Sequence, residues 1–230
     1  MPRSKALKAA TREQVVAAAG RVFRRDGYAA AAVDAVMAEA GLTRGGFYAH
    51  FASKEALFAE VVAADHGLIR MLARRDPRGD WLAQTERIVG DYLQPAHLGE
   101  VAAGCSFAAL TGDAARAGAI VREAYTSAWR RVRAELLRRP GEDWRHAIAR
   151  CGEPGRSAAS ALLAMAVGTL GVAQALADEA ARAALLDSVR PAVLARLRDL
   201  LREAPAAGGQ VKAGVRARAG RPGRASTRPR

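Results

Sequence analysis

The chain has few of the residues that build β-sheets. Aromatic residues make up 5% of its 230 residues, and alanine and leucine outnumber the β-branched types. No stretch alternates apolar and polar residues in the way that predicts a strand. Because alanine and leucine lose little side-chain entropy in a helix, the composition favours an all-α protein.

Cysteine is also scarce, with only Cys105 and Cys151. Two cysteines are too few for a disulfide framework and fit a reducing cytosol, which predicts a cytoplasmic protein. The basic N-terminus lacks the uninterrupted apolar stretch of a signal peptide. Residues 158–177 carry no formal charge. They are mostly alanine with several polar residues, so we expect a helix buried between partners rather than a membrane span.

The residue patterns of common enzymes and metal sites are missing as well. The sequence has no C-x-x-C, H-E-x-x-H, phosphate-binding loop or nucleophile elbow, and its four histidines stand far apart: His50, His66, His97 and His146. Glu142 and Asp143 with His146 could coordinate a metal, but short polar loops carry such groups by chance. We therefore expect no enzymatic activity, no cofactor and no metal site.

Acidic residues are absent from both ends of the chain. Residues 1–12 contain Arg3, Lys5, Lys8 and Arg12, and residues 204–230 contain one lysine and six arginines. These segments carry most of the net charge of +13, so the part between them is nearly neutral. Basic arms suit a polyanion, because phosphate contacts release counterions. The C-terminal segment could instead serve solubility alone.

Turn and capping residues predict helices throughout the first 75 residues. Residues 11–14 have the pattern of a capping box, which predicts the start of the first helix, and Asp26-Gly27 predicts its end. The second helix, 33–40, lacks a capping serine or threonine. Thr43 is expected to cap a third helix, from Arg44 to about Phe51. Only residues 41–43 separate these two short helices, which is the geometry of a helix-turn-helix.

Ser53 predicts the start of a fourth helix, which we expect to continue to about Arg75. Later helices are expected at about 80–94, 105–117, 118–139, 156–178 and 181–203. The chain then divides into a basic N-terminal arm (1–10), a helix-turn-helix domain (11–52), an effector-binding and dimerisation domain (53–203), and a disordered basic tail (204–230).

The densest pattern of turn, aromatic and capping residues is Gly41–Leu57, with the sequence GLTRGGFYAHFASKEAL. Together with Val15-Val16, Phe23, Gly27-Tyr28 and Val33, it resembles the N-terminal domain of the TetR family of bacterial regulators over about residues 11–62, without a gap. The missing cap before Val33 is a departure that weakens a helix end and affects no expected base contact. The resemblance implies a homodimeric repressor that binds a palindromic operator in double-stranded DNA and is released by an effector.

The third helix carries chemistry that suits DNA reading. Thr43, Gly45 and Gly46 are small and let a helix N-terminus approach the major groove, and Arg44 could read a guanine by two hydrogen bonds. Tyr48, His50 and Lys54 could donate to phosphate oxygens, and the arm adds Arg3, Lys5 and Lys8. The resemblance implies the same roles for Thr43, Arg44, Tyr48, His50 and Lys54. Alternatively, Tyr48 is a packing residue and His50 an incidental surface histidine; Phe47 and Phe51 are expected in the core.

In the TetR fold the last two long helices pair with those of a second subunit, which here implies a homodimer through about 156–178 and 181–203. The middle helices would enclose an effector pocket, for which the candidate residues are Trp81, Tyr92, Cys105, Phe107, Tyr125, Trp129 and Met165. Each could equally be ordinary core. Cys105 is expected at a helix N-terminus, where a thiolate is stabilised, so it is either a sensor of electrophiles or a small buried residue.

The resulting hypothesis is a two-state switch in which the fourth helix, running from the DNA-binding unit into the body, acts as the lever. An alternative function is sequence-independent binding of DNA or RNA through the basic arms. The helix-turn-helix favours the first hypothesis, because a base-reading helix serves no purpose in non-specific contacts.

Overall fold

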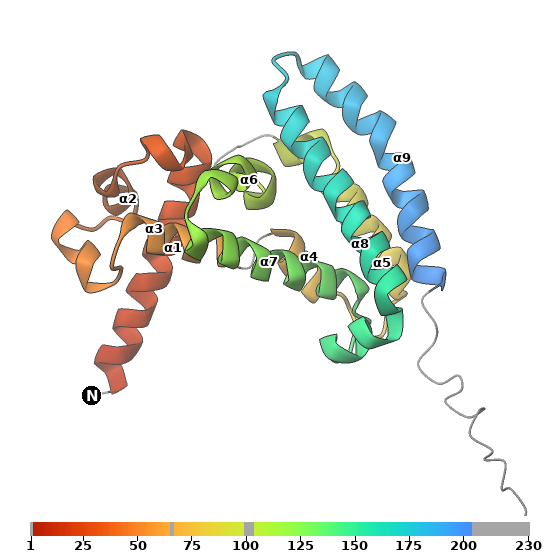
Figure 1. The fold of residues 1–230 in the computed structure, drawn as a ribbon, viewed down its shortest axis with the longest axis horizontal. Coiled ribbons are helices and arrows are strands. Elements are labelled where there is room, and N and C mark those ends of the chain that lie inside the picture. The colour runs from red at the N-terminus through yellow and green to blue at the C-terminus, as the bar shows by residue number, and fades with distance from the viewer. Residues whose placement is uncertain (1, 65–66, 99–103, 204–230) are drawn as a thin grey trace, which may run out of the picture.

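The computed structural model describes residues 2–64, 67–98 and 104–203, and within them every regular element is a helix (Figure 1). The all-α prediction is therefore confirmed. In chain order the elements are α1 (Pro2–Ala30), α2 (Val33–Glu39), the 3₁₀-helix η1 (Arg44–Ala49), α3 (Lys54–Ala63), α4 (Gly67–Ala73), α5 (Trp81–Tyr92), the 3₁₀-helix η2 (Pro95–Leu98), α6 (Ser106–Arg116), α7 (Ala119–Leu137), α8 (Trp144–Ala175) and α9 (Glu179–Glu203). The predicted tail, 204–230, lies outside the described residues.

A first hydrophobic core joins α1, α2, η1 and α3. Phe23 of α1 meets Phe58 of α3 edge-on at 5.2 Å, and Tyr28 stacks on Phe58 at 4.4 Å between ring centroids. Phe47 and Phe51 are buried in this core as expected. The same cluster includes Leu110, Ala114 and Val121, which belong to α6 and the start of α7. The helix-turn-helix unit and the body are thus joined by continuous apolar packing. The boundary at residue 52 stays a prediction, since α3 beyond it shares the first core.

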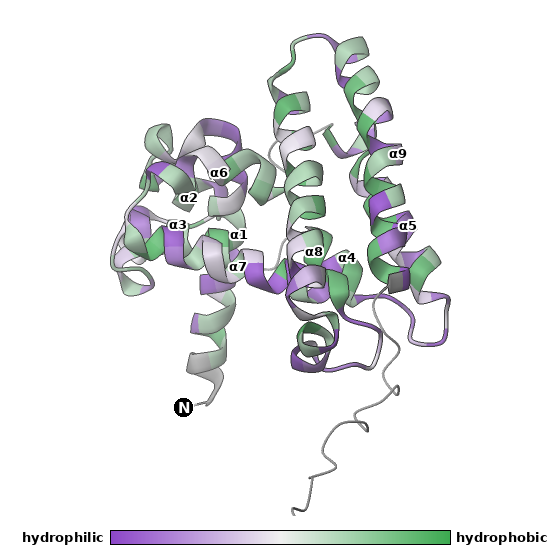
Figure 2. Ribbon diagram, turned by 45° about the vertical axis from the view of Figure 1, so that its right-hand side comes forward, coloured by the Kyte–Doolittle hydropathy of each residue, from purple (hydrophilic) through white to green (hydrophobic). Residues whose placement is uncertain are grey.

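A second core fills the body between α4, α5, α7, α8 and α9. The helices α8 and α9 run antiparallel along one side of the molecule, and α5 packs against α9 (Figures 1 and 2). Leu186, Val193 and Leu197 of α9 are fully buried there, because they recur at helical spacing on one face. Most of the apolar residues of α9 are therefore already covered within the subunit.

The start of the first helix differs from the prediction. Helix α1 begins at Pro2, so most of the expected arm is helical, and the Thr11 hydroxyl donates to the carbonyl of Leu7 at 3.0 Å instead of capping a helix. Alanine, leucine and lysine before Thr11 are strong helix formers, and they carry the helix past the capping box. Gly27 has φ 78° and interrupts the helix where predicted, because glycine tolerates positive φ.

The expected continuous fourth helix was wrong. Helix α3 ends at Ala63, Ala64 has extended backbone (φ −61°, ψ 154°), and α4 begins at Gly67. Asp65, His66 and Gly67 follow one another in the sequence and are all weaker helix formers than alanine. The Ala63 carbonyl accepts a hydrogen bond from the Arg131 guanidinium of α7, which satisfies the end of α3. A rigid lever through residues 53–75 is therefore absent.

Helix α8 is longer than predicted, because one α-helical segment precedes a kink at Gly152 (φ 59°) and the expected helix follows it. By length and composition α8 could cross a membrane, and 39% of its most apolar window is buried inside the protein. Ala159, Leu162, Leu163, Ala166 and Leu170 supply that buried face. Helix α8 is thus half covered by its own chain.

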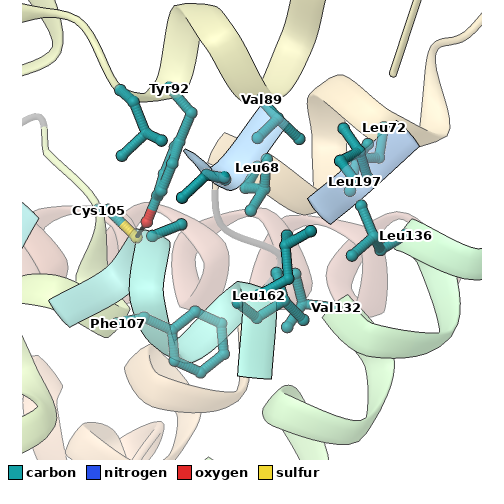
Figure 3. Close-up of a cluster of buried hydrophobic side chains, with 14 of the residues drawn as sticks. Leu68, Leu72, Val89, Tyr92, Cys105, Phe107, Val132, Leu136, Leu162 and Leu197 are labelled. Carbon is teal, nitrogen blue, oxygen red and sulfur yellow. Dashed lines mark hydrogen bonds between the residues drawn. The ribbon is translucent and has the colours of Figure 1, made fainter. Parts of the chain in front are cut away.

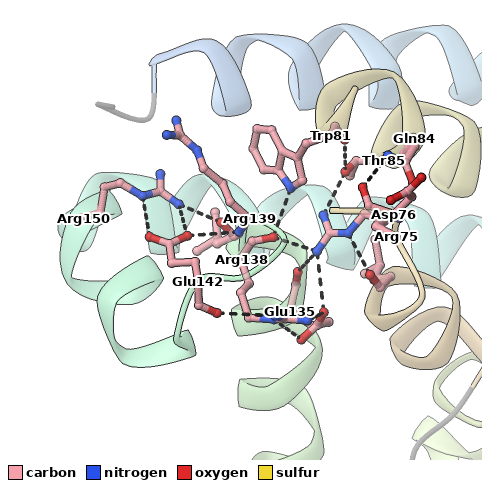
Figure 4. A network of polar contacts seen from close by, with 12 residues as sticks. Arg75, Asp76, Trp81, Gln84, Thr85, Glu135, Arg138, Arg139, Glu142 and Arg150 are labelled. Atoms are coloured by element: carbon pink, nitrogen blue, oxygen red, sulfur yellow. Dashed lines mark hydrogen bonds and ion pairs between the residues drawn. The ribbon is translucent and has the colours of Figure 1, made fainter. Parts of the chain in front are cut away.

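A buried arginine fastens the end of α4 to α5 and α7 (Figure 4). Arg75 donates to the Leu72 carbonyl at 2.7 Å, the Thr85 hydroxyl at 2.9 Å, and the carbonyls of Glu135 and Arg138 at 2.8 and 2.7 Å. The Glu135 carboxylate lies 3.6 Å away. Burial lowers the pKa of Arg75 to about 10, which leaves it charged at neutral pH. The chain therefore buries a charge with nearly all of its donors in use.

We predict that Arg75→Ala lowers the free energy of unfolding by about 3 kcal/mol, because it leaves buried carbonyl and hydroxyl groups without partners. Equilibrium unfolding in urea at matched protein concentration measures the change. The neighbouring Arg74 is exposed, and Arg74→Ala should stay within about 0.5 kcal/mol of the wild type. Equal stabilities of the two variants would contradict the assigned role of Arg75.

Candidate DNA-reading surface and effector region

The turn between α2 and η1 is closed by backbone hydrogen bonds. Gly41 has φ 67°, its N–H donates to the Ala38 carbonyl at 2.9 Å, and the Leu42 N–H donates to the Met37 carbonyl at 2.8 Å. This pair of bonds is a Schellman motif, which requires a left-handed residue at Gly41. Phe47 anchors η1 from below, with 1% of its surface exposed. The turn and this anchor fix the direction in which η1 faces solvent.

The third helix is a 3₁₀-helix rather than the expected α-helix, and Thr43 makes no side-chain cap. Adjacent glycines, Gly45 and Gly46, weaken an α-helix, and the segment is short. A β-carbon at Gly45 would meet nothing within 4 Å, and one at Gly46 would meet only the Met37 side chain at 3.6 Å. Packing within the described residues thus gives no reason for a glycine at position 45.

Several predicted DNA-contacting residues share one exposed surface on η1. Thr43, Arg44, Gly45 and Tyr48 are exposed, and Gly46 is half-buried. Tyr48 is 69% exposed although its ring leans edge-on against Phe47 at 5.1 Å. The Arg44 guanidinium forms an ion pair of 2.9 Å with Asp34 of α2, and both side chains remain largely exposed. An exposed ion pair of this kind contributes little stability, so Arg44 can leave it.

Lys54 and His50 are more involved in the protein's own packing. The Lys54 ammonium donates to the Ala29 carbonyl at 3.2 Å and lies 4.6 Å from the centre of the Tyr28 ring. Burial lowers its pKa. The His50 side chain is half-buried, and its carbonyl accepts from Arg12. A phosphate contact by the Lys54 ammonium would have to share these interactions, whereas the bond from Arg12 uses the His50 backbone and leaves its imidazole out.

Arg12 is a residue whose role the sequence did not reveal. Its guanidinium pairs with Glu60 of α3 and lies 4.3 Å from the centre of the Phe51 ring. It therefore ties α1 to α3. Among the residues of the expected arm, Lys8 is exposed on α1. The side chains of Arg3 and Lys5 lie outside the described residues.

Five of the seven candidate pocket residues meet in one part of the body core, some of them shown in Figure 3. The Tyr92 hydroxyl donates to Sγ of Cys105 at 2.9 Å, and Phe107 meets Tyr125 and Trp129 edge-on at 5.2 and 6.0 Å. Cys105 is 4% exposed and is the N-cap residue of α6, as expected. These side chains pack against one another.

Trp81 and Met165 lie elsewhere. The Trp81 indole donates to the Arg138 carbonyl at 3.0 Å within the Arg75 network, and Met165 is 39% exposed on α8. A cleft of about 720 Å³ lies between α1, α3, α4 and α6, and of the seven candidates only Cys105 lines it. Hydrophobicity predicts which side chains are buried, and it does not predict where the packing leaves space.

Comparison with known proteins points to one family. Residues 15–61 match the family model described as bacterial regulatory proteins, tetR family. The fold is similar to that of E. coli NemR in its reduced form (TM-score 0.62, 21% identity, 82% of this chain and 95% of that one). A putative TetR-family regulator from Mesorhizobium loti is also similar (TM-score 0.51, 18% identity, 82% of this chain and 96% of that one). Residues 15–61 thus carry a TetR-type N-terminal domain, and over most of its length the chain shares the fold of these two structures.

A curated relative matches over a shorter stretch. An uncharacterized HTH-type transcriptional regulator, YdgC of Bacillus subtilis, is 37% identical over 62 residues, which are 27% of this chain and 32% of that protein. The family model likewise matches only residues 15–61, and the solved structures, at 18 and 21% identity, relate the rest of the chain by fold alone. The family model that matches residues 15–61 describes regulatory proteins, which agrees with the expectation that this protein is not an enzyme.

Two helix starts within the TetR-type unit allow a paired prediction. Ala32 caps α2 without any side-chain hydrogen bond, whereas the Ser53 hydroxyl accepts from the Ala56 N–H at 3.0 Å at the start of α3. We expect Ala32→Ser to raise the free energy of unfolding by about 1 kcal/mol and Ser53→Ala to lower it by about the same amount. Thermal and urea unfolding measure both. Changes of the same sign in the two variants would refute this account of the caps.

Proposed function

We propose that this TetR-family protein is a cytoplasmic, homodimeric repressor that reads a palindromic operator with η1 and is released by an effector. The observation that carries the proposal is the exposed surface of η1. Arg44 and Tyr48 are each 69% exposed on a helix anchored by the buried Phe47. Tyr48 packs only edge-on against Phe47 and leaves most of its surface exposed, and contact with the DNA backbone would cover that surface.

Arg44 is the residue that we propose reads a base. A guanidinium can donate two hydrogen bonds to a guanine in the major groove. Asp34 holds the guanidinium at 2.9 Å in the free protein, and both groups are accessible. Because an ion pair this exposed is weak, Arg44 can exchange Asp34 for a guanine at little cost. Tyr48 would contact the phosphate backbone and fix the register.

The dimer that we propose uses mainly α8. Its outer face carries an uncharged stripe at alternating spacings of three and four residues, and every member is exposed: Ala158, Ala161, Met165, Gly168, Val172 and Ala175. Such spacing makes one continuous seam along a helix, and small residues let a second helix approach closely. Val172 alone is 55% exposed. A two-fold dimer would place two copies of η1 on successive half-sites.

Release requires that the body and the DNA-reading unit move together. Since α3 and α4 are separate helices, we propose that coupling passes through packing of α3 on α7 and of α1 on α6. A hydrogen bond also crosses this boundary, from the Gly118 N–H to Glu55 at 3.1 Å. Cys105 lies at the start of α6, close to α1, so either a bound ligand or reaction of this thiol with an electrophile would act at the boundary.

The main test is selection of bound sites from random duplex DNA at near-physiological salt. We expect an enriched palindrome, and Arg44→Ala should weaken binding to it by about tenfold or more and relax the preference at one base pair of each half-site. Arg87→Ala, an exposed arginine on α5, is the matched control and should bind as the wild type does.

The competing hypothesis is non-specific binding through the basic ends of the chain. It predicts binding without enrichment, insensitive to Arg44→Ala and lost when residues 204–230 are removed. That result would overturn the operator proposal and would establish a general polyanion binder, with the steep salt dependence such binding has.

The proposed dimer is tested by Val172→Asp, which places a charge near the C-terminal end of the α8 stripe, at an exposed position outside the core. We expect a folded monomer in sedimentation equilibrium, with unchanged helical content and much weaker operator binding. Ile120→Asp is the control, because Ile120 is 54% exposed on α7, away from the stripe. A Val172→Asp protein that stays dimeric would refute this interface.

A further inference from the structure

A cleft lies where the DNA-reading unit (α1, α2, η1 and α3) meets the body (α4 to α9). Helices α1 and α3 supply one side, and α4 and the start of α6 supply the other, around a volume of about 720 Å³. That volume falls within the range of small-molecule sites. Apolar side chains from three helices contribute to its wall: Val16, Val61 and Leu68.

The charged lining of this cleft is mainly cationic. Four arginines face two glutamates, and the arginines are Arg12, Arg21, Arg24 and Arg70. Arg12 pairs with Glu60, and Arg21 pairs with Glu39 at 2.7 Å. No ion pair joins Arg70 to a carboxylate within the part of the chain that the structure describes. Positive charge on this surface therefore exceeds what its own carboxylates neutralise.

Ser106 and His97 also line this cleft, and both carry polar atoms that can form hydrogen bonds. Arg24 donates to the Ser106 hydroxyl at 2.9 Å, which joins α1 to α6. Nε2 of His97 is buried and has no hydrogen-bond partner among the described residues. Burial chiefly lowers the pKa of Arg24, Cys105 acts in the opposite sense, and the nearby Arg21 and Arg70 lower it further. An anion placed here would relieve that repulsion between guanidinium groups.

We propose that this cleft binds an organic anion whose acidic group is held by Arg70 and Arg24 and whose apolar part lies along Val16, Val61 and Leu68. The anion is a carboxylate or phosphate ester with a hydrocarbon portion, because guanidinium groups bind such oxyanions and Val16, Val61 and Leu68 offer apolar contact beside them. The role of this anion as an effector rests on the repressor function proposed above.

The position of the cleft gives the bound anion a direct effect on DNA reading. Its walls belong to α1 and α3 of the DNA-reading unit and to α4 and α6 of the body. A ligand that touches both sides stabilises one relative arrangement of the two parts. If that arrangement differs from the DNA-bound one, the ligand lowers operator affinity. The size of the effect equals the ratio of the ligand's affinities for the two arrangements.

The test uses the full-length protein without DNA and titrates octanoate in a calorimeter, with the neutral octanamide of similar shape and inorganic phosphate as comparisons. We expect octanoate to bind more tightly than either, since it alone combines charge with a hydrocarbon chain. Arg70→Gln should weaken octanoate binding by about tenfold, which is the loss expected for one charge-assisted contact. Arg70 is exposed, so this variant should fold normally.

Arg74→Gln is the matched control. Arg74 lies four residues after Arg70 and does not line the cleft, so this variant loses the same charge at a position away from the site. Equal octanoate affinities for the wild type and Arg70→Gln, equal binding of octanoate and octanamide, or no binding of octanoate would each overturn the proposal. Operator binding measured without any anion tests the proposed function separately. A protein that binds its operator but does not bind octanoate would therefore refute only the proposed anion site.

Discussion

Apolar contact between α3 and the helices α6 and α7 holds the helix-turn-helix unit on the rest of the chain. Leu57, Phe58 and Val61 of α3 lie in one cluster with Leu110 and Val121. Because buried apolar surfaces resist separation and are densely packed, a shift of α6 or α7 has to be accommodated by α3. The η1 surface stands on that same core through Phe47. Its orientation therefore depends on helices that belong to the body.

Arginines make the polar connections around this packing. Arg75 links the C-terminal end of α4 to α5 and α7, and backbone carbonyl groups surround its charge. Arg12, Arg24 and Arg131 join elements of the DNA-reading unit to one another or to the body. The planar guanidinium can serve several acceptors at once, which lets one side chain link two or three helices. The cleft lined by Arg24 and Arg70 lies among these connections.

The sequence predicted most helices from their caps and apolar periodicity. Ser53, Gly27 and Gly41 act where expected, because capping and positive φ are local requirements that a few neighbouring residues set. Predictions failed where local signals competed. The capping box at Thr11 yielded to the helix-forming residues before it, Gly45-Gly46 tightened the third helix, and the predicted fourth helix is interrupted between Ala63 and Gly67.

By itself, the sequence determined the helical class, the helix-turn-helix and the identity of the residues on its exposed side, since these follow from spacing along one segment. Only the tertiary structure decided how those segments meet. It separated Trp81 and Met165 from the other pocket candidates, engaged Lys54 with Tyr28, and brought Arg24 and Arg70 to one cleft. The physical reason is that burial and charge proximity depend on contacts between residues distant in the chain, and periodicity within a segment carries no information about its partner.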